Sequence, residues 1–243
     1  MTEHMNVPRP ARIALVGDRS PQVQAHQRIP SILRWAAPDP EAVDPYWIPT
    51  ATVADVPALH AFDGIWLVPA GEPYADQEGA LLAADVARTA GVPFLGTCAG
   101  FQHAAMAYAR ATLGADPVTA ESDPHHPDPV IAPLACALVG EEDTVVVRAG
   151  TLAAELMGDG PRTERFFCRY GIPPVWGERL QDTGLVASGV GEDGTVRMLE
   201  IPGHPFFVGS LFQPELSSDR AWVHPLIRGF VAAALRAVAA PAV

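Results

Sequence analysis

The sequence predicts an α/β fold: a single three-layer domain with a mostly parallel central sheet, helices on both faces and an antiparallel extension in its second half. Two observations lead to this prediction. In the first half, short apolar runs alternate with segments of helical spacing, which is the pattern of a parallel sheet covered by helices. In the second half, apolar runs follow one another closely, and Asp193-Gly194 is a hairpin signal between two of them. A length of 243 residues suits one domain.

The first half of the chain supplies the parallel part of the sheet. Residues 1–10 contain two prolines and are expected to form a loose leader before a domain that spans residues 11–240. Gly91 and Gly114 follow two of the predicted helices, as expected of glycine at a helix C-terminus. Strands are predicted at residues 12–16, 46–49, 65–68 and 92–96, and helices at residues 21–37, 79–90 and 101–113.

The second half supplies the antiparallel extension. Residues 116–143 are rich in proline and acidic side chains, so they are expected to form a long surface loop. A helix over residues 225–239 is predicted to close the chain. The strand candidates are residues 145–148, 186–190, 196–201 and 206–212.

The composition excludes several classes of function. The chain carries 28 acidic and 16 basic side chains, a net charge of −12, and this balance argues against nucleic acid or an anionic membrane as a partner. All 16 basic residues are arginine, which excludes mechanisms that need a P-loop lysine or a Schiff-base lysine. No apolar run approaches the roughly 20 residues of a membrane span.

The cysteines indicate the redox environment. Cys98, Cys136 and Cys168 are odd in number and irregularly spaced, which favours a reducing, cytoplasmic environment over a disulfide framework. The sequence has no CxxC motif and no cluster of cysteine and histidine ligands, and His125-His126 is interpreted as part of a solvated loop. Neither a metal nor a cofactor is therefore expected.

The sharpest local signal is Gly96-Thr97-Cys98-Ala99-Gly100, between a predicted strand and a predicted helix. A G-x-nucleophile-x-G sequence permits a tight turn that presents the nucleophile at the carboxyl end of the strand. The helix that follows directs N–H groups and the positive end of its dipole at the sulfur, which favours a reactive thiolate. The alternative is a small buried cysteine before a helix. The complete motif favours Cys98 as a nucleophile, with the N–H of Ala99 as an oxyanion-hole donor.

Four segments together resemble a known family. They are Gly96-Thr97-Cys98-Ala99-Gly100-Phe101-Gln102, Glu164-Arg165-Phe166-Phe167-Cys168-Arg169-Tyr170, Gly203-His204-Pro205-Phe206-Phe207-Val208-Gly209 and Phe212-Gln213-Pro214-Glu215. The family is the class I, or triad, glutamine amidotransferases, and the sequence is most similar to the glutaminase domain of CTP synthase. Stand-alone proteins named for the CTP synthase C-terminal region fit best. The resemblance covers most of the chain and implies a flavodoxin-like fold.

The resemblance implies a catalytic role for several residues and breaks at one of them. Cys98 would attack a side-chain amide and form a thioester, while Gly71 and Ala99 would donate hydrogen bonds to the oxyanion. The family motif near the end is His-Pro-Glu, in which the histidine is the base and the glutamate orients it. Here Gln213 replaces the histidine and Glu215 remains. An amide does not exchange protons near neutral pH, so glutaminase turnover is expected to be lost or slowed by about 10²–10⁴-fold.

Four further positions match residues that hold glutamine in CTP synthases: Gln102, Glu121, Arg169 and Tyr170. A carboxylate such as Glu121 suits an α-ammonium group, and an arginine such as Arg169 suits an α-carboxylate. Considered without the resemblance, these two side chains are more simply a solvated loop acid and a surface cation.

Three histidines are candidates for a substitute base. His103 follows Gln102 in the predicted helix and is expected to point away from Cys98. His204 begins the strand that leads to residue 213, and His224 lies in the loop before the last helix. The sequence favours none of them as the base.

Cys168 has two interpretations. By resemblance its segment borders the substrate pocket, and the neighbouring Arg165 and Arg169 would lower the pKa of its thiol. A thiol facing Cys98 would suit redox or thiol-transfer chemistry, so Cys168 is included among the candidate site residues. The alternative is a buried cysteine packed beside two phenylalanines. Cys136, in an alanine-rich stretch, is interpreted as structural.

Three functions remain open at this point. The first is a Cys98-dependent amidase or amidotransferase that acts on glutamine or a related amino acid, including a variant that passes the acyl group to an amine or a thiol. The second is a non-hydrolytic pseudo-glutaminase that binds an amino acid or a partner protein. The third is a thiol redox protein that uses Cys98 and Cys168. In each case the chain is not expected to be a complete CTP synthase, and a separate synthetase or a second copy in a homodimer is the partner to be considered.

Overall fold

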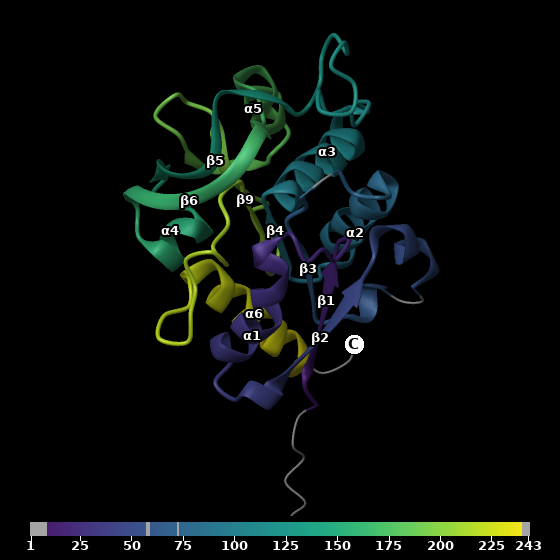
Figure 1. The fold of residues 1–243 in the computed structure, drawn as a ribbon, viewed down its shortest axis with the longest axis vertical. Helices are drawn as coiled ribbons and strands as arrows, with labels where there is room; N and C mark the ends of the chain where they lie inside the picture. Colours follow the sequence, from purple (N-terminus) through teal and green to yellow (C-terminus); the bar gives the residue numbers. More distant parts are fainter. Residues whose placement is uncertain (1–8, 57–58, 72, 240–243) are drawn as a thin grey trace, which may run out of the picture.

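One mixed sheet of nine strands organises the computed structural model, which describes residues 9–56, 59–71 and 73–239 (Figure 1). The strand order is β2-β1-β3-β4-β9-β8-β7-β5-β6. The strands are β1 Ala11–Val16, β2 Val43–Ile48, β3 Gly64–Leu67, β4 Phe94–Thr97, β5 Ala132–Val147, β6 Gly160–Gly171, β7 Val186–Val190, β8 Val196–Glu200 and β9 Phe207–Ser210. The helices are α1 Gln24–Ala36, α2 Gln77–Ala90, α3 Ala99–Leu113, α4 Leu152–Met157, α5 Pro174–Asp182 and α6 Pro225–Ala239, with short 3-10 turns at Pro40–Ala42, Thr50–Asp55 and Leu59–Ala61.

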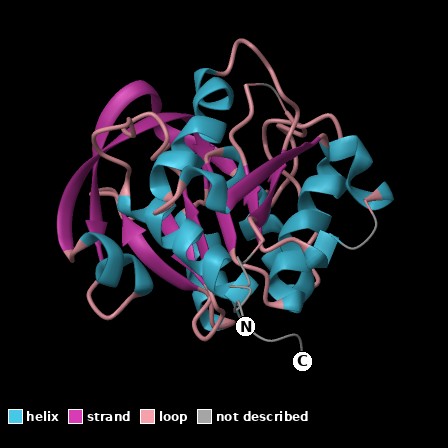
Figure 2. Ribbon diagram, turned by 90° about the horizontal axis from the view of Figure 1, so that it is seen from below, coloured by secondary structure: helices cyan, strands magenta, loops and turns pink. Residues whose placement is uncertain are grey.

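Strands β2, β1, β3, β4 and β9 run parallel and form the half of the sheet that holds the Cys98 turn. Helices cover both of its faces (Figure 2), with α1 against α6 on one face and α2 against α3 on the other (Figure 1). Because both faces are covered, the central strands are apolar on both sides, and every residue of β3 and β4 is buried. The predicted three-layer α/β architecture is confirmed.

Strands β8, β7, β5 and β6 form the antiparallel extension that the second half of the sequence predicts. The predicted bounds of β7 and of α6 agree with the structure. The turn between β7 and β8 contains Gly194 at φ 76°, in the left-handed region that the hairpin signal requires. Gly91 and Gly114 end α2 and α3 at φ 69° and 63°, as predicted.

The predicted surface loop over residues 116–143 is wrong in its second part. Residues 132–147 form β5, which pairs with β6, and neither β6 nor α5 was predicted as an element. Most side chains in the middle of β5 are exposed, and two register shifts interrupt its pairing. A ribbon with one solvated face needs no apolar run, and ion pairs such as Arg165–Glu142, at 2.9 Å, join its two strands. The composition of β5 therefore resembles that of a surface loop.

The two ends of the chain are described only in part. Residues 1–8 of the predicted leader and residue 240 of the predicted domain lie outside the described residues. The described end of the leader is held, because Arg9 donates hydrogen bonds of 2.6 and 2.8 Å to the carboxylate of Asp63. Among the described helices, none combines the length and apolar character needed to cross a membrane.

Candidate active site

The turn at Cys98 is strained in the way its motif predicts. Strand β4 ends at Thr97, α3 begins at Ala99, and Cys98 between them adopts φ 53° and ψ −110°. Among the described residues, Cys98 is the one non-glycine residue with a positive φ. The Cys98 N–H donates to the carbonyl of Ser210 on β9 at 2.9 Å, which holds the strained residue against the sheet. Strain of this kind persists where the surrounding structure enforces it, and it is common at active sites.

The two glycines of the turn are required by close backbone contacts. A Cβ on Gly96 would lie 2.7 Å from the carbonyl oxygen of Gly100. A Cβ on Gly100 would lie 1.9 Å from the carbonyl oxygen of Leu67 in β3. Both obstacles are main-chain atoms, which cannot rotate away as a side chain can. The close packing of α3 against β3 and β4 therefore depends on these two residues.

Substituting Gly100 by alanine is expected to lower the free energy of unfolding by about 3 kcal/mol, because its Cβ would overlap the main chain of Leu67. Gly177→Ala in α5 is the matched control, since its Cβ would meet only a side-chain methyl group of Val196, at 2.9 Å. Alanine also gains up to about 1 kcal/mol of helix propensity at either position. Urea unfolding measures both changes. Equal changes in the two variants would contradict this account of the turn.

The sulfur of Cys98 lies in contact with the sulfur of Cys168. The two Sγ atoms are 2.7 Å apart, and both side chains are buried. Burial alternates along β6: Glu164, Phe166 and Cys168 are buried, while Arg165 and Arg169 are exposed. The Cys168 thiol also donates to the carbonyl of Leu211 at 3.1 Å.

The prediction that arginines lower the pKa of Cys168 is wrong. Burial raises the pKa of the Cys168 thiol well above its usual value, and the hydrogen bond with Cys98 raises it further. Because the side chains of Arg165 and Arg169 are exposed, solvent screens their charges. Cys168 is therefore a protonated thiol at neutral pH.

A cavity of about 410 Å³ opens in front of the two sulfurs. It brings together residues from α3, β6 and the loops after β3 and α3, and the Gln102 amide donates to the carbonyl of Tyr170 at 2.9 Å across it. Eight predicted site residues line this cavity: Gly71, Cys98, Ala99, Gln102, Glu121, Cys168, Arg169 and Tyr170. Gln213 and Glu215 are not among its lining residues.

Tyr74 and His103 line the same cavity, although the sequence analysis assigned neither to it. The Tyr74 hydroxyl donates to the carbonyl of Val68, and its ring packs edge-on against His103 with centroids 4.7 Å apart. His103 was expected to point away from Cys98, whereas the structure places it in the wall of the same cavity. His103 lies four residues after Ala99, whose carbonyl accepts from its Nδ1 at 2.8 Å. The four-residue spacing of Ala99 and His103 is the sequence signal that both residues lie on one face of α3.

His103 is a weak candidate for the missing base. Burial lowers the pKa of its imidazole to about 4, so the ring is neutral at pH 7 and has little affinity for a proton. His204 and His224 do not line the cavity of Cys98. His204 Nε2 donates to the carbonyl of Ala87 at 2.9 Å, and His224 Nε2 lies 3.2 Å from a carboxylate oxygen of Glu164.

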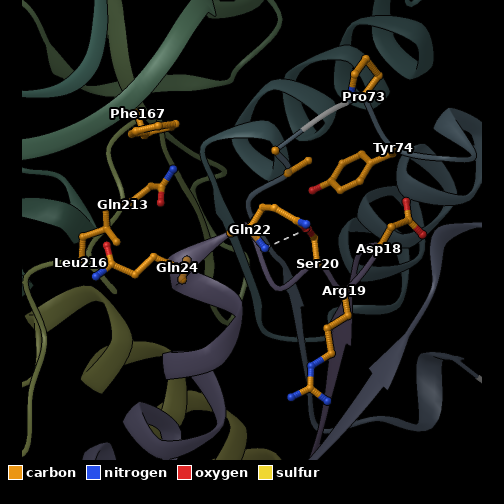
Figure 3. Close-up of a pocket in the computed structure, with 14 residues that line it drawn as sticks. Asp18, Arg19, Ser20, Gln22, Gln24, Pro73, Tyr74, Phe167, Gln213 and Leu216 are labelled. Atoms are coloured by element: carbon orange, nitrogen blue, oxygen red, sulfur yellow. Dashed lines mark hydrogen bonds between the residues drawn. The ribbon is translucent and has the colours of Figure 1, made fainter.

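Gln213 lines a second, adjacent cavity of about 770 Å³. Figure 3 shows Phe167 and Gln213 on one side of this cavity and Tyr74 and Asp18 on the other. Five residues line both cavities, so the two spaces adjoin: Ala70, Gly71, Pro73, Tyr74 and Phe167. The structure thus places Gln213 beside the cavity of Cys98 rather than in its wall.

Glu215 is buried with an unused oxygen. Its side chain is 0% exposed, and its Oε1 accepts from the Thr97 hydroxyl at 3.2 Å. The other oxygen, Oε2, is buried with no hydrogen-bond partner. Burial raises the pKa of the Glu215 carboxyl to about 8, so the group is mostly protonated at pH 7. A buried polar atom without a partner is uncommon in native structures and calls for an explanation.

The described residues contain no group of three or more metal-ligating side chains. One cavity brings together the thiol of Cys98, the start of α3 and polar side chains that a small polar ligand can reach.

Comparison with known proteins identifies relatives that match most of this chain. The sequence model of the family described as glutamine amidotransferase class-I matches residues 41–232. CTP synthase of Rubrobacter xylanophilus is 35% identical over 244 residues, covering 94% of this chain and 44% of that protein. CTP synthase of Sulfurisphaera tokodaii is 36% identical over 203 residues, covering 77% of this chain and 38% of that protein. The chain thus spans less than half the length of these curated relatives.

Solved structures show the same fold at lower identity. The glutaminase domain of Trypanosoma brucei CTP synthase, with bound acivicin, superposes with a TM-score of 0.82 at 22% identity, covering 93% of this chain and 94% of that one. A glutamine amidotransferase of Thermotoga maritima superposes with a TM-score of 0.59 at 12% identity, covering 95% and 99%. The flavodoxin-like fold that the resemblance implies is therefore confirmed.

Proposed function

This chain belongs to the class I glutamine amidotransferases, and on that premise we propose that it is a Cys98-dependent amidase-type enzyme. Its substrate is the side-chain amide of glutamine or of a related amino acid. The observation that carries the proposal is the strained Cys98 at the wall of a cavity that Gln102, Glu121, Arg169 and Tyr170 also line. By resemblance, these four positions match residues that hold glutamine in CTP synthases.

The pocket offers complementary groups to both ends of an amino acid. Glu121 supplies a carboxylate for the α-ammonium group, and Arg169 supplies a guanidinium for the α-carboxylate. Gln102 and Tyr170, joined by their hydrogen bond, line the same cavity as Cys98. A substrate held at its charged end would present its side-chain amide to the sulfur.

The reaction begins with the thiolate of Cys98. It attacks the amide carbon, and N–H groups of Ala99 and Gly71 stabilise the negative charge that develops on the oxygen. The C–N bond then breaks, the nitrogen takes up the proton that the thiol released, and ammonia leaves. A thioester between Cys98 and the acyl group remains, and hydrolysis of that thioester completes the cycle.

The absent histidine affects the second half of this cycle most. The thiol of a model cysteine has a pKa of about 8.5, whereas bulk water has a pKa of about 15.7. Water therefore depends on a general base far more than the thiol does. With Gln213 beside the site and Glu215 mostly protonated, hydrolysis of the thioester is expected to be the slow step.

A specific observation favours acyl transfer as a second candidate function. The cavity beside Gln213 is about 770 Å³, larger than the glutamine pocket, and it adjoins that pocket along five shared residues. An amine or a thiol bound there would reach the thioester from the side where the histidine is missing. Both are better nucleophiles than water without a base, so such an acceptor would compete with hydrolysis.

Labelling with acivicin, the compound bound in the T. brucei structure, tests the pocket and the nucleophile together. Wild type is expected to gain one adduct on Cys98, and an excess of L-glutamine is expected to slow its formation. Cys98→Ala is expected to gain none, because the nucleophile is absent. Intact-mass spectrometry with peptide mapping measures each result.

Cys136→Ser is the matched control for this experiment, because Cys136 is exposed and lines neither cavity. Labelling of this variant should equal that of wild type. Wild type that takes up no acivicin, or labelling that glutamine does not slow, would refute the proposed pocket. Labelling with glutamine protection but without any cleavage of glutamine would favour the pseudo-glutaminase instead.

A further inference from the structure

Amide cleavage needs one thiol, yet this site contains two in contact. The Sγ atoms of Cys98 and Cys168 are 2.7 Å apart, whereas a disulfide bond measures about 2.05 Å, so the sulfurs need to close by only about 0.7 Å. Cys168 has no place in the thioester cycle described above. Its position against the nucleophile therefore calls for a function of its own.

The contact is fixed by the backbone on both sides. Cys98 is held in the strained turn between β4 and α3, where its N–H donates to Ser210. Cys168 lies on the inward face of β6, where its thiol donates to Leu211. The cysteines are 70 residues apart in the sequence and meet through the packing of separate elements. Neither side chain can leave this contact without a change of rotamer in a buried position.

Both sulfurs also face a space that a small reagent can enter. Cys98 and Cys168 line the cavity of about 410 Å³, together with the polar side chains of Gln102 and Arg169. A hydroperoxide is small enough for this cavity and needs hydrogen-bond donors as its O–O bond breaks. Amide and guanidinium groups supply such donors.

We propose that Cys98 and Cys168 form a thiol–disulfide couple that reduces hydroperoxides, as a second activity of this site. It is distinct from the proposed amide chemistry, because it involves neither glutamine nor the oxyanion hole. The oxidant is hydrogen peroxide or a small organic hydroperoxide, and the reductant that restores the pair is a low-molecular-weight dithiol or two monothiols.

The first step forms a sulfenic acid. The Cys98 thiolate attacks one oxygen of the hydroperoxide, the O–O bond breaks, and the departing oxygen takes up a proton and leaves as water or an alcohol. The sulfur of Cys98 is oxidised by two electrons and the peroxide is reduced by two. In the second step, the sulfur of Cys168 attacks the sulfur of Cys98, the S–O bond breaks, and the hydroxyl group takes the proton of Cys168 and leaves as water.

The environment of Cys168 suits the second step. Burial and then the hydrogen bond and charge of Cys98 keep the pKa of the Cys168 thiol high. When Cys98 becomes a neutral sulfenic acid, the contribution from its charge disappears and Cys168 loses its proton more readily. The order of events is thereby set, with Cys98 reacting first and Cys168 second.

A disulfide at this position also removes the nucleophile of the amide chemistry. Reduction by the dithiol breaks the S–S bond, returns both thiols and leaves the reductant as a disulfide. The amidase-type activity would therefore exist only in the reduced protein.

The test uses the full chain with the Cys136→Ser substitution, because the exposed Cys136 would otherwise form disulfides between molecules. The protein is treated with an equimolar amount of hydrogen peroxide, denatured and alkylated. We expect the loss of two alkylatable thiols, a peptide that joins Cys98 to Cys168, and full recovery of both thiols with dithiothreitol.

Two further variants in the same background identify each step. Cys168→Ser should stop at the sulfenic acid, which dimedone captures on Cys98, while Cys98→Ser should leave Cys168 unoxidised. Dimedone capture at Cys98 that is as extensive with Cys168 as without it, or no disulfide after the peroxide is consumed, would overturn the proposal. If a second substitution prevents folding, the number of thiols lost by the Cys136→Ser protein alone still tests the formation of the disulfide. No glutamine is present, so a failure here is distinguishable from a failure of the amide chemistry.

Discussion

Replacing Gln213 by histidine is expected to raise the rate of ammonia release from L-glutamine by about 10²–10⁴-fold, the usual contribution of a general base. The physical reason is the state of Glu215. Its Oε2 is buried without a hydrogen-bond partner, and burial keeps the carboxyl mostly protonated at pH 7. An imidazole at position 213 would give that oxygen a hydrogen-bond donor and give the site a group that accepts a proton from water. Coupled detection of ammonia at saturating glutamine measures the effect.

Two variants show whether the gain comes from the base. Gln213→Asn keeps a polar amide and is expected to stay at the wild-type rate. Glu215→Gln combined with Gln213→His is expected to lose much of the gain, because a neutral amide stabilises the protonated imidazole less than a carboxylate does. The account would be contradicted if Gln213→His released ammonia no faster than Gln213→Asn while both variants still took up acivicin at Cys98.

The contribution of Glu215 to the stability of the protein is expected to fall between pH 5 and pH 8. Burial raises the pKa of this carboxyl from 4.5 to about 8 in the folded protein. Below pH 4.5 both states are protonated and the contribution of Glu215 to stability is complete. As the pH rises further, the unfolded chain ionises while the folded chain keeps its proton, so about 1.4 kcal/mol is lost per pH unit. The expected total is about 4 kcal/mol by pH 8, after which the loss ends.

Glu215→Gln is the control for this prediction, because its amide resembles the protonated carboxyl and does not titrate. The difference in unfolding free energy between wild type and Glu215→Gln should change by about 4 kcal/mol between pH 5 and pH 8. His103, with its pKa lowered to about 4, acts in the opposite sense, since its contribution is lost as the pH falls below 6.5. Both proteins contain His103, so its effect cancels. A difference that is constant across this range would show that Glu215 is ionised in the folded state.

The parallel half of the fold follows from the sequence because its strands are buried on both faces. Runs such as Ile65–Val68 have no polar residue to obscure them, and glycines mark the helix ends. The turn at Cys98 is equally local, since five consecutive residues determine it. The antiparallel ribbon of β5 and β6 is different. Its outer face is charged, and its pairing joins residues as far apart as Ala132 and Gly171, which no local pattern reveals.

The site was predicted in composition but not in its internal contacts. Eight of the predicted site residues line one cavity. The contact between Cys98 and Cys168 depends on which face of β6 the cysteine occupies, and β6 was not predicted as a strand. The pKa of Cys168 was predicted in the wrong direction, because burial outweighs the nearby arginines. Sequence shows charges but not the depth at which a group lies.

The formation of a thioester on Cys98 tests the central claim most directly. Wild type is mixed with L-glutamine, quenched in acid at successive times, and its intact mass is measured. Since the missing base slows attack by water more than attack by the thiol, we expect a glutamyl adduct on Cys98 that accumulates in wild type, is cleared faster in Gln213→His, and is absent from Cys98→Ala. If neither wild type nor Gln213→His forms an adduct or releases ammonia, Cys98 does not attack the amide of glutamine, and the proposed function is wrong.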